Sequence, residues 1–303
     1  MESARQRINA AIEGIGLDRV VETSVANTIA VQYSRTTQME NRRWRACLAI
    51  VVRGQKDVVL GSTRHALTPG HFTLTPVPLA VTGRIAEAPF ACLLIGLDPQ
   101  RLGRVIAEMD TRDEPDVELG RGLFQGTLTS SMWAATARLA EAFSSPEEAA
   151  VLGPGRVREL LFYVLQGPCG PAIRGFVRAG SEAHRIGAAV HRIESQLNAP
   201  LDIAALAREA SLSRTAFFAQ FKRVTAHSPL QFQKRLRLLE AQRLMVDERT
   251  TAADAAFRVG FASASQFSRE YARMFGESPS RHVARLRDQL RGLGVRVKPV
   301  SNQ

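Results

Sequence analysis

The chain has 303 residues, 45% of them hydrophobic, so it is long enough to bury a sizeable core in one to three domains. Its formal net charge of +11 is unevenly distributed: residues 1–184 carry a net charge of +1, whereas residues 185–291 carry +8. This asymmetry predicts that only the C-terminal part meets a polyanion. The net charge alone is also typical of a generally basic surface, so the choice between these two interpretations depends on the sequence motifs.

Membrane and secretory proteins are the classes that the sequence disfavours. No apolar run approaches the ~18 residues that a membrane helix needs, and residues 1–6 lack a signal-peptide pattern. We therefore expect a cytoplasmic protein without a membrane partner. Cys47, Cys92 and Cys169 lack metal-site spacing and are expected to be small buried hydrophobes. Alternatively, Cys47 or Cys92 senses electrophiles through a lowered thiol pKa.

The N-terminal part is predicted to be rich in β structure after a short amphipathic helix at residues 3–16. Apolar, partly β-branched stretches predict strands at 47–52, 58–60, 65–67, 72–75, 79–82 and 90–95. Turns are predicted at 54–56, at 61–62 and at Pro69-Gly70. Short strands with regular turns are typical of a small antiparallel barrel or sandwich.

The period of the hydrophobic pattern then becomes helical. Asp98 is a plausible cap for a helix that begins at Pro99, and further helices are predicted at 123–143 and 157–165. An acidic loop is expected at 110–118. The Gly- and Pro-containing stretch 166–171 should stop the last of these helices. We expect an N-terminal domain over 1–175 and a linker over 176–185.

The remainder, 186–291, is predicted to be an all-α domain, followed by a tail at 292–303. Its first helix is expected at 186–197, and each of the next six begins after a residue that favours the N-cap position. Ser228-Pro229 and Ser278-Pro279 both place a proline at the first helical position. These expected caps are Asp202, Ser213, Ser228, Thr251, Ser263 and Ser278.

A repeat of about fifty residues is the most informative feature of this domain. Ala207 and Ala256 are small residues where one helix packs closely on the next, and Leu212 and Phe261 supply the inward apolar residue of a turn. Gly260 suits a turn with positive φ. The offset is 49 residues before this turn and 50 after it. The repeat predicts two helix-turn-helix units, which could enter successive major grooves about 34 Å apart.

Each second helix of these units is a candidate recognition helix. The aromatic pairs Phe217/Phe221 and Phe267/Tyr271 are spaced i and i+4 and should pack in the core. The opposite faces should meet base edges, with Arg269 suited to guanine and Gln266 to adenine. The candidate base-contacting residues are Arg214, Thr215, Phe218, Ala219, Lys222, Ala264, Ser265, Gln266 and Arg269. Arg223, Lys234 and Arg273 are predicted to contact phosphates.

These residues resemble the AraC/XylS family of bacterial transcription regulators over about residues 186–290. The resemblance is carried by Ala207, Ser213, Phe217, Phe221-Lys222, Ser228-Pro229, Arg235-Leu236, Ala256, Gly260-Phe261, Ser263, Phe267-Ser268-Arg269, Phe275-Gly276 and Pro279. The segment 229–237 and the stretches 52–56, 60–61, 68–71 and 97–99 resemble one branch of that family. The resemblance implies a cupin-like sensing domain, a homodimer and contact with RNA polymerase. Phe218-Ala219-Gln220 departs from the polar or basic residues that relatives often carry there.

Three functions stay open for the N-terminal domain. It could sense a small-molecule effector in an apolar interior, serve only for dimerisation, or be a metal-dependent enzyme. A metal site normally needs three protein ligands, and only His65, His71 and Glu87 are candidates, so we predict no enzyme, no metal and no cofactor. The candidate lining residues are Leu48, Ile50, Val52, Val59, Leu74, Val81, Leu93 and Ile95. The sequence as a whole predicts an effector-responsive transcription activator that binds double-stranded DNA.

Overall fold

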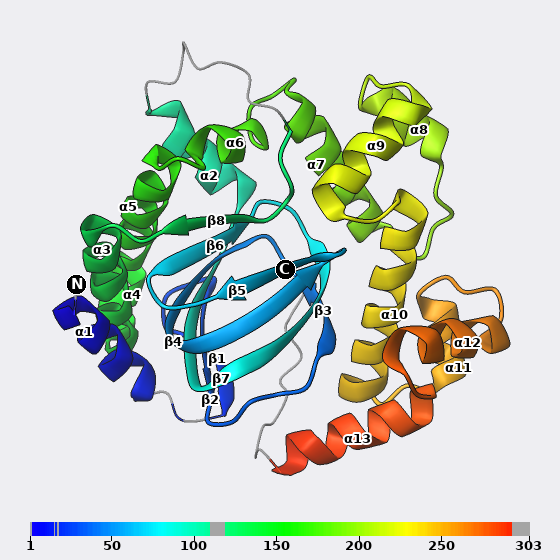
Figure 1. Cartoon of the computed structure of the whole chain (residues 1–303), viewed down its shortest axis with the longest axis horizontal. Coiled ribbons are helices and arrows are strands. Elements are labelled where there is room, and N and C mark those ends of the chain that lie inside the picture. The colour runs from blue at the N-terminus through cyan, green and yellow to red at the C-terminus, as the bar shows by residue number, and fades with distance from the viewer. Residues whose placement is uncertain (1, 15, 17, 110–118, 293–303) are drawn as a thin grey trace.

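A computed structural model of the chain describes residues 2–14, 16, 18–109 and 119–292 (Figure 1). The predicted acidic loop at 110–118 and the tail from residue 293 onward lie outside the described residues. Figure 1 shows a curved antiparallel sheet between two groups of helices, one from the N-terminal part of the chain and one from the C-terminal part. The predicted α+β class, a sheet domain followed by a helical domain, is confirmed.

The N-terminal part contains eight described strands in one sheet with the order β1-β2-β7-β4-β6-β8, in which β3 also pairs with β7 and β5 with β4. All of these pairings are antiparallel. The elements are α1 (Glu2–Glu13), β1 (Arg19–Glu22), β2 (Thr28–Tyr33), β3 (Glu40–Trp44), β4 (Cys47–Leu60), β5 (Thr63–Leu67), β6 (His71–Thr75), β7 (Leu79–Gly96), α2 (Pro99–Ala107), β8 (Phe124–Thr127), α3 (Ser130–Glu141), the 3-10 turn η1 (Ala142–Ser144), α4 (Pro146–Val151), α5 (Gly153–Gln166) and α6 (Gly170–Gly175).

The long strands β4 and β7 differ from the prediction, which divided each of them in two. The predicted turn at 54–56 is instead an irregular stretch of β4, where the pairing with β7 shifts register between Val51 and Lys56. Gly54 has φ +71° there, and a Cβ at this position would lie 2.5 Å from the carbonyl oxygen of Glu87. A bulge and a turn both favour glycine with positive φ, so composition alone does not separate them.

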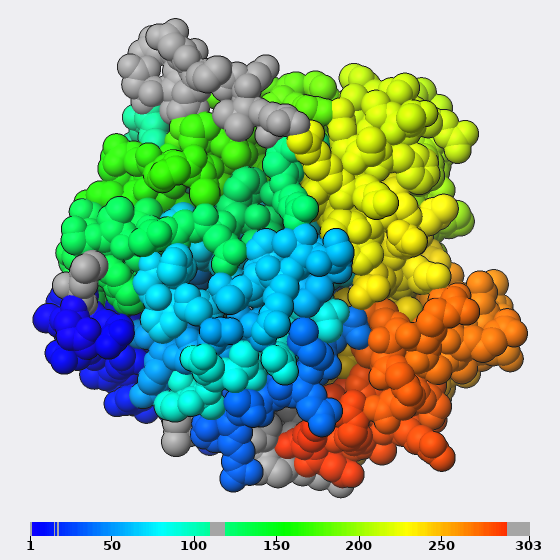
Figure 2. Space-filling model, in the orientation of Figure 1, coloured from blue at the N-terminus to red at the C-terminus, as the bar shows by residue number. Residues whose placement is uncertain are grey.

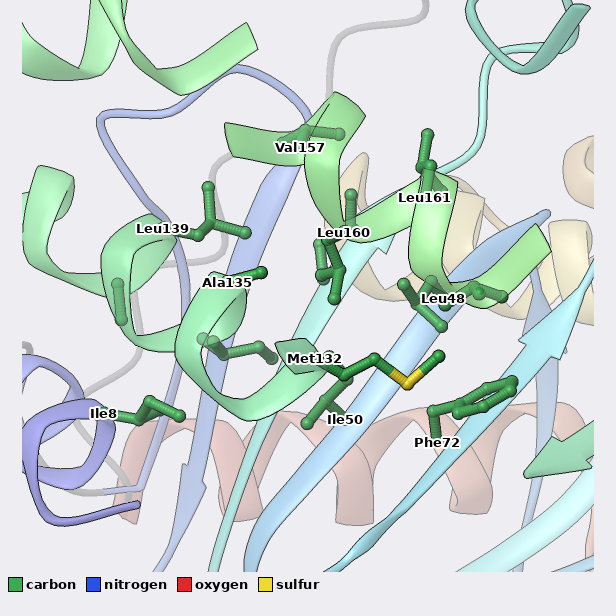
Figure 3. Close-up of a cluster of buried hydrophobic side chains, with 14 of the residues drawn as sticks. Ile8, Leu48, Ile50, Phe72, Met132, Ala135, Leu139, Val157, Leu160 and Leu161 are labelled. Carbon is green, nitrogen blue, oxygen red and sulfur yellow. The ribbon is translucent and has the colours of Figure 1, made fainter. Parts of the chain in front are cut away.

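The faces of the central strands belong to two different cores. Leu48 and Ile50 of β4 pack under α1, α3 and α5 (Figure 3), whereas Ala49 and Val51 face the opposite core. The candidate lining residues therefore do not form one surface. Six of them lie in the helix-covered core, namely Leu48, Ile50, Val52, Leu74, Leu93 and Ile95. Val81 belongs to the opposite core.

The C-terminal part consists of helices throughout its described residues, as predicted. These are α7 (Glu182–Ser195), α8 (Ile203–Glu209), α9 (Arg214–Thr225), α10 (Pro229–Asp247), α11 (Ala252–Arg258), α12 (Ala264–Phe275) and α13 (Pro279–Gly292). Helix α7 begins four residues before the predicted start because Ser181 caps it. The side chains of Asp202, Ser213, Ser228, Thr251 and Ser263 all accept the predicted capping hydrogen bond. No helix in the described ranges is long and apolar enough to span a bilayer.

The two parts of the chain pack against each other. Figure 2 shows the C-terminal helices, coloured yellow to red, against the N-terminal sheet and its connecting segments. One hydrophobic core contains both Val81 and Phe90 of β7 and Phe217 and Phe221 of α9. The first half of the C-terminal part therefore shares its core with the sheet.

Candidate nucleic-acid interface

Two helix-turn-helix units are present, formed by α8 with α9 and by α11 with α12. The buried residues Ala207 and Ala256 occupy equivalent places in them. Each accepts the same turn hydrogen bond at 2.9 Å, from the amide of Leu212 in the first unit and of Phe261 in the second. The repeat predicted from the sequence is therefore a repeat of backbone geometry.

The residue before the apolar turn residue has positive φ in both units. Ser211 has φ +54° in the first and Gly260 has φ +88° in the second. The recognition helices also end alike, because Ala226 after α9 and Gly276 after α12 both adopt the left-handed conformation that commonly terminates helices. Positions 226 and 276 are 50 apart, as expected after the one-residue insertion in the second turn.

The inner faces of α9 and α12 are aromatic. The Phe217 and Phe221 ring centroids lie 5.7 Å apart, and those of Phe267 and Tyr271 lie 5.4 Å apart. All four side chains are buried, which confirms the predicted core face. The opposite face of each helix is consequently the one left for a ligand.

The candidate contact residues lie on these outer faces. In α9, Phe218 is half-buried, while the exposed candidates are Arg214, Thr215, Ala219, Lys222 and Arg223. In α12, Ala264 is half-buried, while the exposed candidates are Ser265, Gln266, Arg269 and Arg273. Within the described residues Arg269 makes no ion pair. Its guanidinium is available to a base edge or a phosphate.

The two other basic candidates around α12 are held by one carboxylate. Lys234 Nζ and Arg273 Nη1 each lie 3.0 Å from a carboxylate oxygen of Glu270. The hydrogen bond from Lys234 is the main cause of the lowered pKa of Glu270, so this carboxylate is ionised at neutral pH. Phosphate contacts by Lys234 or Arg273 would compete with Glu270.

Helix α10 connects the two units and carries an arginine whose role the sequence did not suggest. Arg237 donates from Nε to the carbonyl of Leu197 (2.5 Å), from Nη2 to that of Ala199 (2.9 Å) and from Nη1 to that of Gly260 (2.9 Å). The first two carbonyls precede the first unit and the third lies in the turn of the second. One guanidinium therefore joins the backbones of both units, a role that no local sequence signal marks.

The two histidines considered as metal ligands hydrogen-bond to different partners in the N-terminal part. His65 Nδ1 lies 3.0 Å from Gln125 Oε1, and His71 Nδ1 lies 3.1 Å from Thr68 Oγ1. Burial raises the pKa of the Cys47 thiol and raises that of Cys92 to about 12. Both thiols are therefore protonated at neutral pH, which disfavours the electrophile-sensing alternative because the thiolate is the reactive form.

Comparisons with known families agree with this geometry. Residues 27–172 match the family model described as AraC-type transcriptional regulator N-terminus, and residues 206–285 match the one described as helix-turn-helix domain. The described strands of the sheet fall almost entirely in the first match, and α9 to α12 fall in the second. Both parts of the chain are thus covered.

Curated proteins show a graded similarity. The chain is 27% identical to the HTH-type transcriptional regulator ExsA of Pseudomonas aeruginosa over 198 residues, which are 65% of this chain and 69% of ExsA. It is 35% identical to the HTH-type transcriptional activator RhaS of Escherichia coli over 75 residues, 25% of this chain and 27% of RhaS. A match of 29% to histidine kinase P4 of Formosa agariphila covers 32% of this chain but spans 7% of that protein.

Among solved structures, ToxT from Vibrio cholerae has a similar fold. The superposition covers 87% of this chain and 99% of ToxT with a TM-score of 0.55, at 10% sequence identity. A likeness at this identity concerns the fold, which here includes both parts of the chain. The two family matches, which together cover most of the chain, show that it belongs to the AraC family of DNA-binding transcriptional regulators.

Proposed function

We propose that this regulator is a sequence-specific activator that places α9 and α12 in adjacent major grooves of one duplex. The observation that carries this proposal is the pair of equivalent units on a single helix, each with its aromatic face buried and its polar face exposed. Recognition helices held on a rigid frame can read two half-sites about one DNA turn apart. The net charge of +8 over 185–291 favours binding to a polyanion.

The two helices should read bases by different chemistry. In α12, Arg269 can donate two hydrogen bonds to guanine and Gln266 can pair with adenine in the major groove. In α9, the Thr215 methyl group and the half-buried Phe218 suit contact with a thymine methyl group. We therefore assign hydrogen-bonded recognition mainly to the second unit and apolar recognition mainly to the first.

The replacement Arg269→Ala tests this assignment. Loss of a bidentate contact should weaken cognate binding by about 1–3 kcal/mol and relax preference at one base pair. We would measure it by gel shift on a duplex selected by the full-length protein, with excess random competitor DNA and a salt series. Arg273→Ala is the matched control, and it should weaken cognate and random DNA alike. An equal loss on both DNAs for Arg269→Ala would make this residue a phosphate contact.

Activation is the finer part of the proposal, and the similarity to RhaS, which is a transcriptional activator, supports it. With purified RNA polymerase and a template that carries the selected duplex upstream of a promoter, adding the protein should raise transcript yield. A fall in yield would instead make the protein a repressor. Homodimerisation, contact with RNA polymerase and response to a small-molecule effector stay predictions of the sequence. A solved structure of ToxT contains a bound unsaturated fatty acid.

A further inference from the structure

The N-terminal domain contacts the last turn of both recognition helices at equivalent positions. The Gly122 amide donates to the Val224 carbonyl near the end of α9 at 2.9 Å. Asn41 Nδ2 donates to the Met274 carbonyl near the end of α12, also at 2.9 Å. Positions 224 and 274 are 50 apart, the offset between the two units beyond the turn. Both carbonyls belong to the last four of a helix, which have no partner within it.

The contact with the first unit is tight. A Cβ at Gly122 would lie 2.9 Å from the Val224 carbonyl oxygen, and a Cβ at Gly61 would lie 2.7 Å from the Cβ of Ala226. Val224 and Leu79 also belong to one hydrophobic core. Since close-packed interiors resist deformation, the first recognition helix has little freedom to move relative to the sheet.

The contact with the second unit is smaller and depends on β3. The second unit has a separate core, although Met274 and Phe275 pack against both cores. Asn41 Oδ1 accepts from Arg235 Nη2 at 3.1 Å and from Thr82 Oγ1 at 3.2 Å. The Asn41 amide is therefore held by β7 and α10 in the orientation that lets its nitrogen donate to α12.

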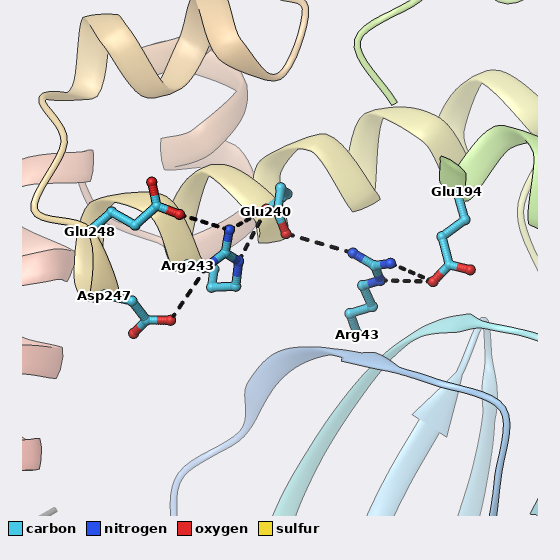
Figure 4. Close-up of polar contacts among 6 residues, drawn as sticks. All are labelled: Arg43, Glu194, Glu240, Arg243, Asp247 and Glu248. Carbon is cyan, nitrogen blue, oxygen red and sulfur yellow. Dashed lines mark hydrogen bonds and ion pairs between the residues drawn. The ribbon is translucent and has the colours of Figure 1, made fainter. Parts of the chain in front are cut away.

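An ion-pair network anchors the same strand to the helices (Figure 4). Arg43 Nε donates to Glu194 of α7 at 3.1 Å, and Arg43 Nη1 lies 3.6 Å from Glu240 of α10. The side chain of Arg43 is 25% exposed and that of Glu194 is 17% exposed, so solvent screens this pair less than an open surface pair. Arg42, between the two anchoring residues, pairs with Glu40 and is exposed.

We propose that Asn41 is a positioning residue that fixes α12 relative to α9 and thereby sets the base-pair separation between the two half-sites. This inference rests on the proposed function, because it requires both helices to bind one duplex. One added base pair moves a half-site by about 3.4 Å along the axis and rotates it by roughly 35°. While Asn41 holds α12 against β3, α12 cannot move with the displaced half-site. Without this contact, α12 can move part of the way.

The test compares full-length wild type with Asn41→Ala, Asn41→Asp and the same-strand control Arg42→Ala. Asn41→Asp keeps an acceptor for Arg235 but replaces the amide donor that faces the Met274 carbonyl. The probes are the duplex that wild type selects from a random library and the same duplex with one base pair inserted between its half-sites. Thermal unfolding establishes that each variant is folded.

The measured quantity is the ratio of the two dissociation constants for each protein. Wild type and Arg42→Ala should lose at least about tenfold in affinity on insertion, and both Asn41 variants should lose several-fold less. An insertion penalty equal to that of wild type in folded Asn41 variants would overturn the role of Asn41 while leaving the proposed function intact. A wild-type protein indifferent to the insertion would overturn both, because only one helix would then be engaged.

Discussion

Gly260→Val should abolish cognate DNA binding and lower the free energy of unfolding by at least about 3 kcal/mol. Gly260 has φ +88°, a region that β-branched residues rarely adopt. Its Cβ would also lie 2.6 Å from the carbonyl oxygen and 2.8 Å from the Cα of Asn198. Backbone atoms cannot rotate away as a side chain can, so the turn must move, and α12 with it. Denaturant unfolding and the gel shift measure the two effects.

The variant Gly276→Val separates the cost of backbone strain at positive φ from the cost of a steric clash. Gly276 follows the same recognition helix and has φ +80°, but nothing lies within 4 Å of a Cβ built there. This control should show the cost of the left-handed conformation alone, about 1–3 kcal/mol, and should retain binding that Gly260→Val loses. Equal destabilisation of the two variants would show that the close contact with Asn198 adds nothing to the free-energy cost of Gly260→Val.

Arg237→Met should cost about 2–4 kcal/mol of unfolding free energy and weaken cognate binding. The replacement keeps an aliphatic side chain of similar length but removes the donors to the Leu197, Ala199 and Gly260 carbonyls. Gln233 Nε2 still donates to the Ala199 carbonyl at 2.9 Å, so we expect the loss of the guanidinium donors to affect the Gly260 carbonyl most. Because that carbonyl belongs to the second turn, α12 should lose its fixed position.

Two further variants make this result specific. Arg237→Lys keeps the charge but cannot reach three carbonyls with one planar group, so it should recover only part of the stability. Arg281→Met removes an exposed arginine from α13 and should change stability by less than about 0.5 kcal/mol. Urea unfolding of these three variants and of the wild type gives the free energies of unfolding to be compared. Wild-type stability in Arg237→Met would show that water replaces the guanidinium without cost.

The C-terminal fold was largely predictable because its signals are local. A cap such as Ser213 and its helix are adjacent in sequence, and the repeat duplicates each signal. In the N-terminal part, β1, β2, β3 and β8 were not predicted. Strand β3 is polar at Glu40, Arg42 and Arg43 and exists because it pairs with β7. Such strands are stabilised by distant partners, which short-range patterns do not contain.

The same distinction applies to the candidate interface. The outward faces of α9 and α12 follow from helical periodicity, so the side chains on these faces could be assigned from the sequence alone. Asn41, Gly122 and Arg237 could not be identified in this way. Asn41 contacts Met274, which lies 233 residues away, and no local signal marks a contact across that separation.

The sharing of α10 between two cores bears on how divisible this domain is. Phe232 and Leu236 belong to one core, while Leu244 and Met245 belong to the other. A cut anywhere along the helix would leave one unit without the helix that closes its core, and a deletion of two residues would turn one set of apolar side chains roughly 160° away from its core. A single helix-turn-helix unit could therefore be transferred to another protein only together with the whole of α10. New side chains would then have to bury the face of α10 that packs against the other unit.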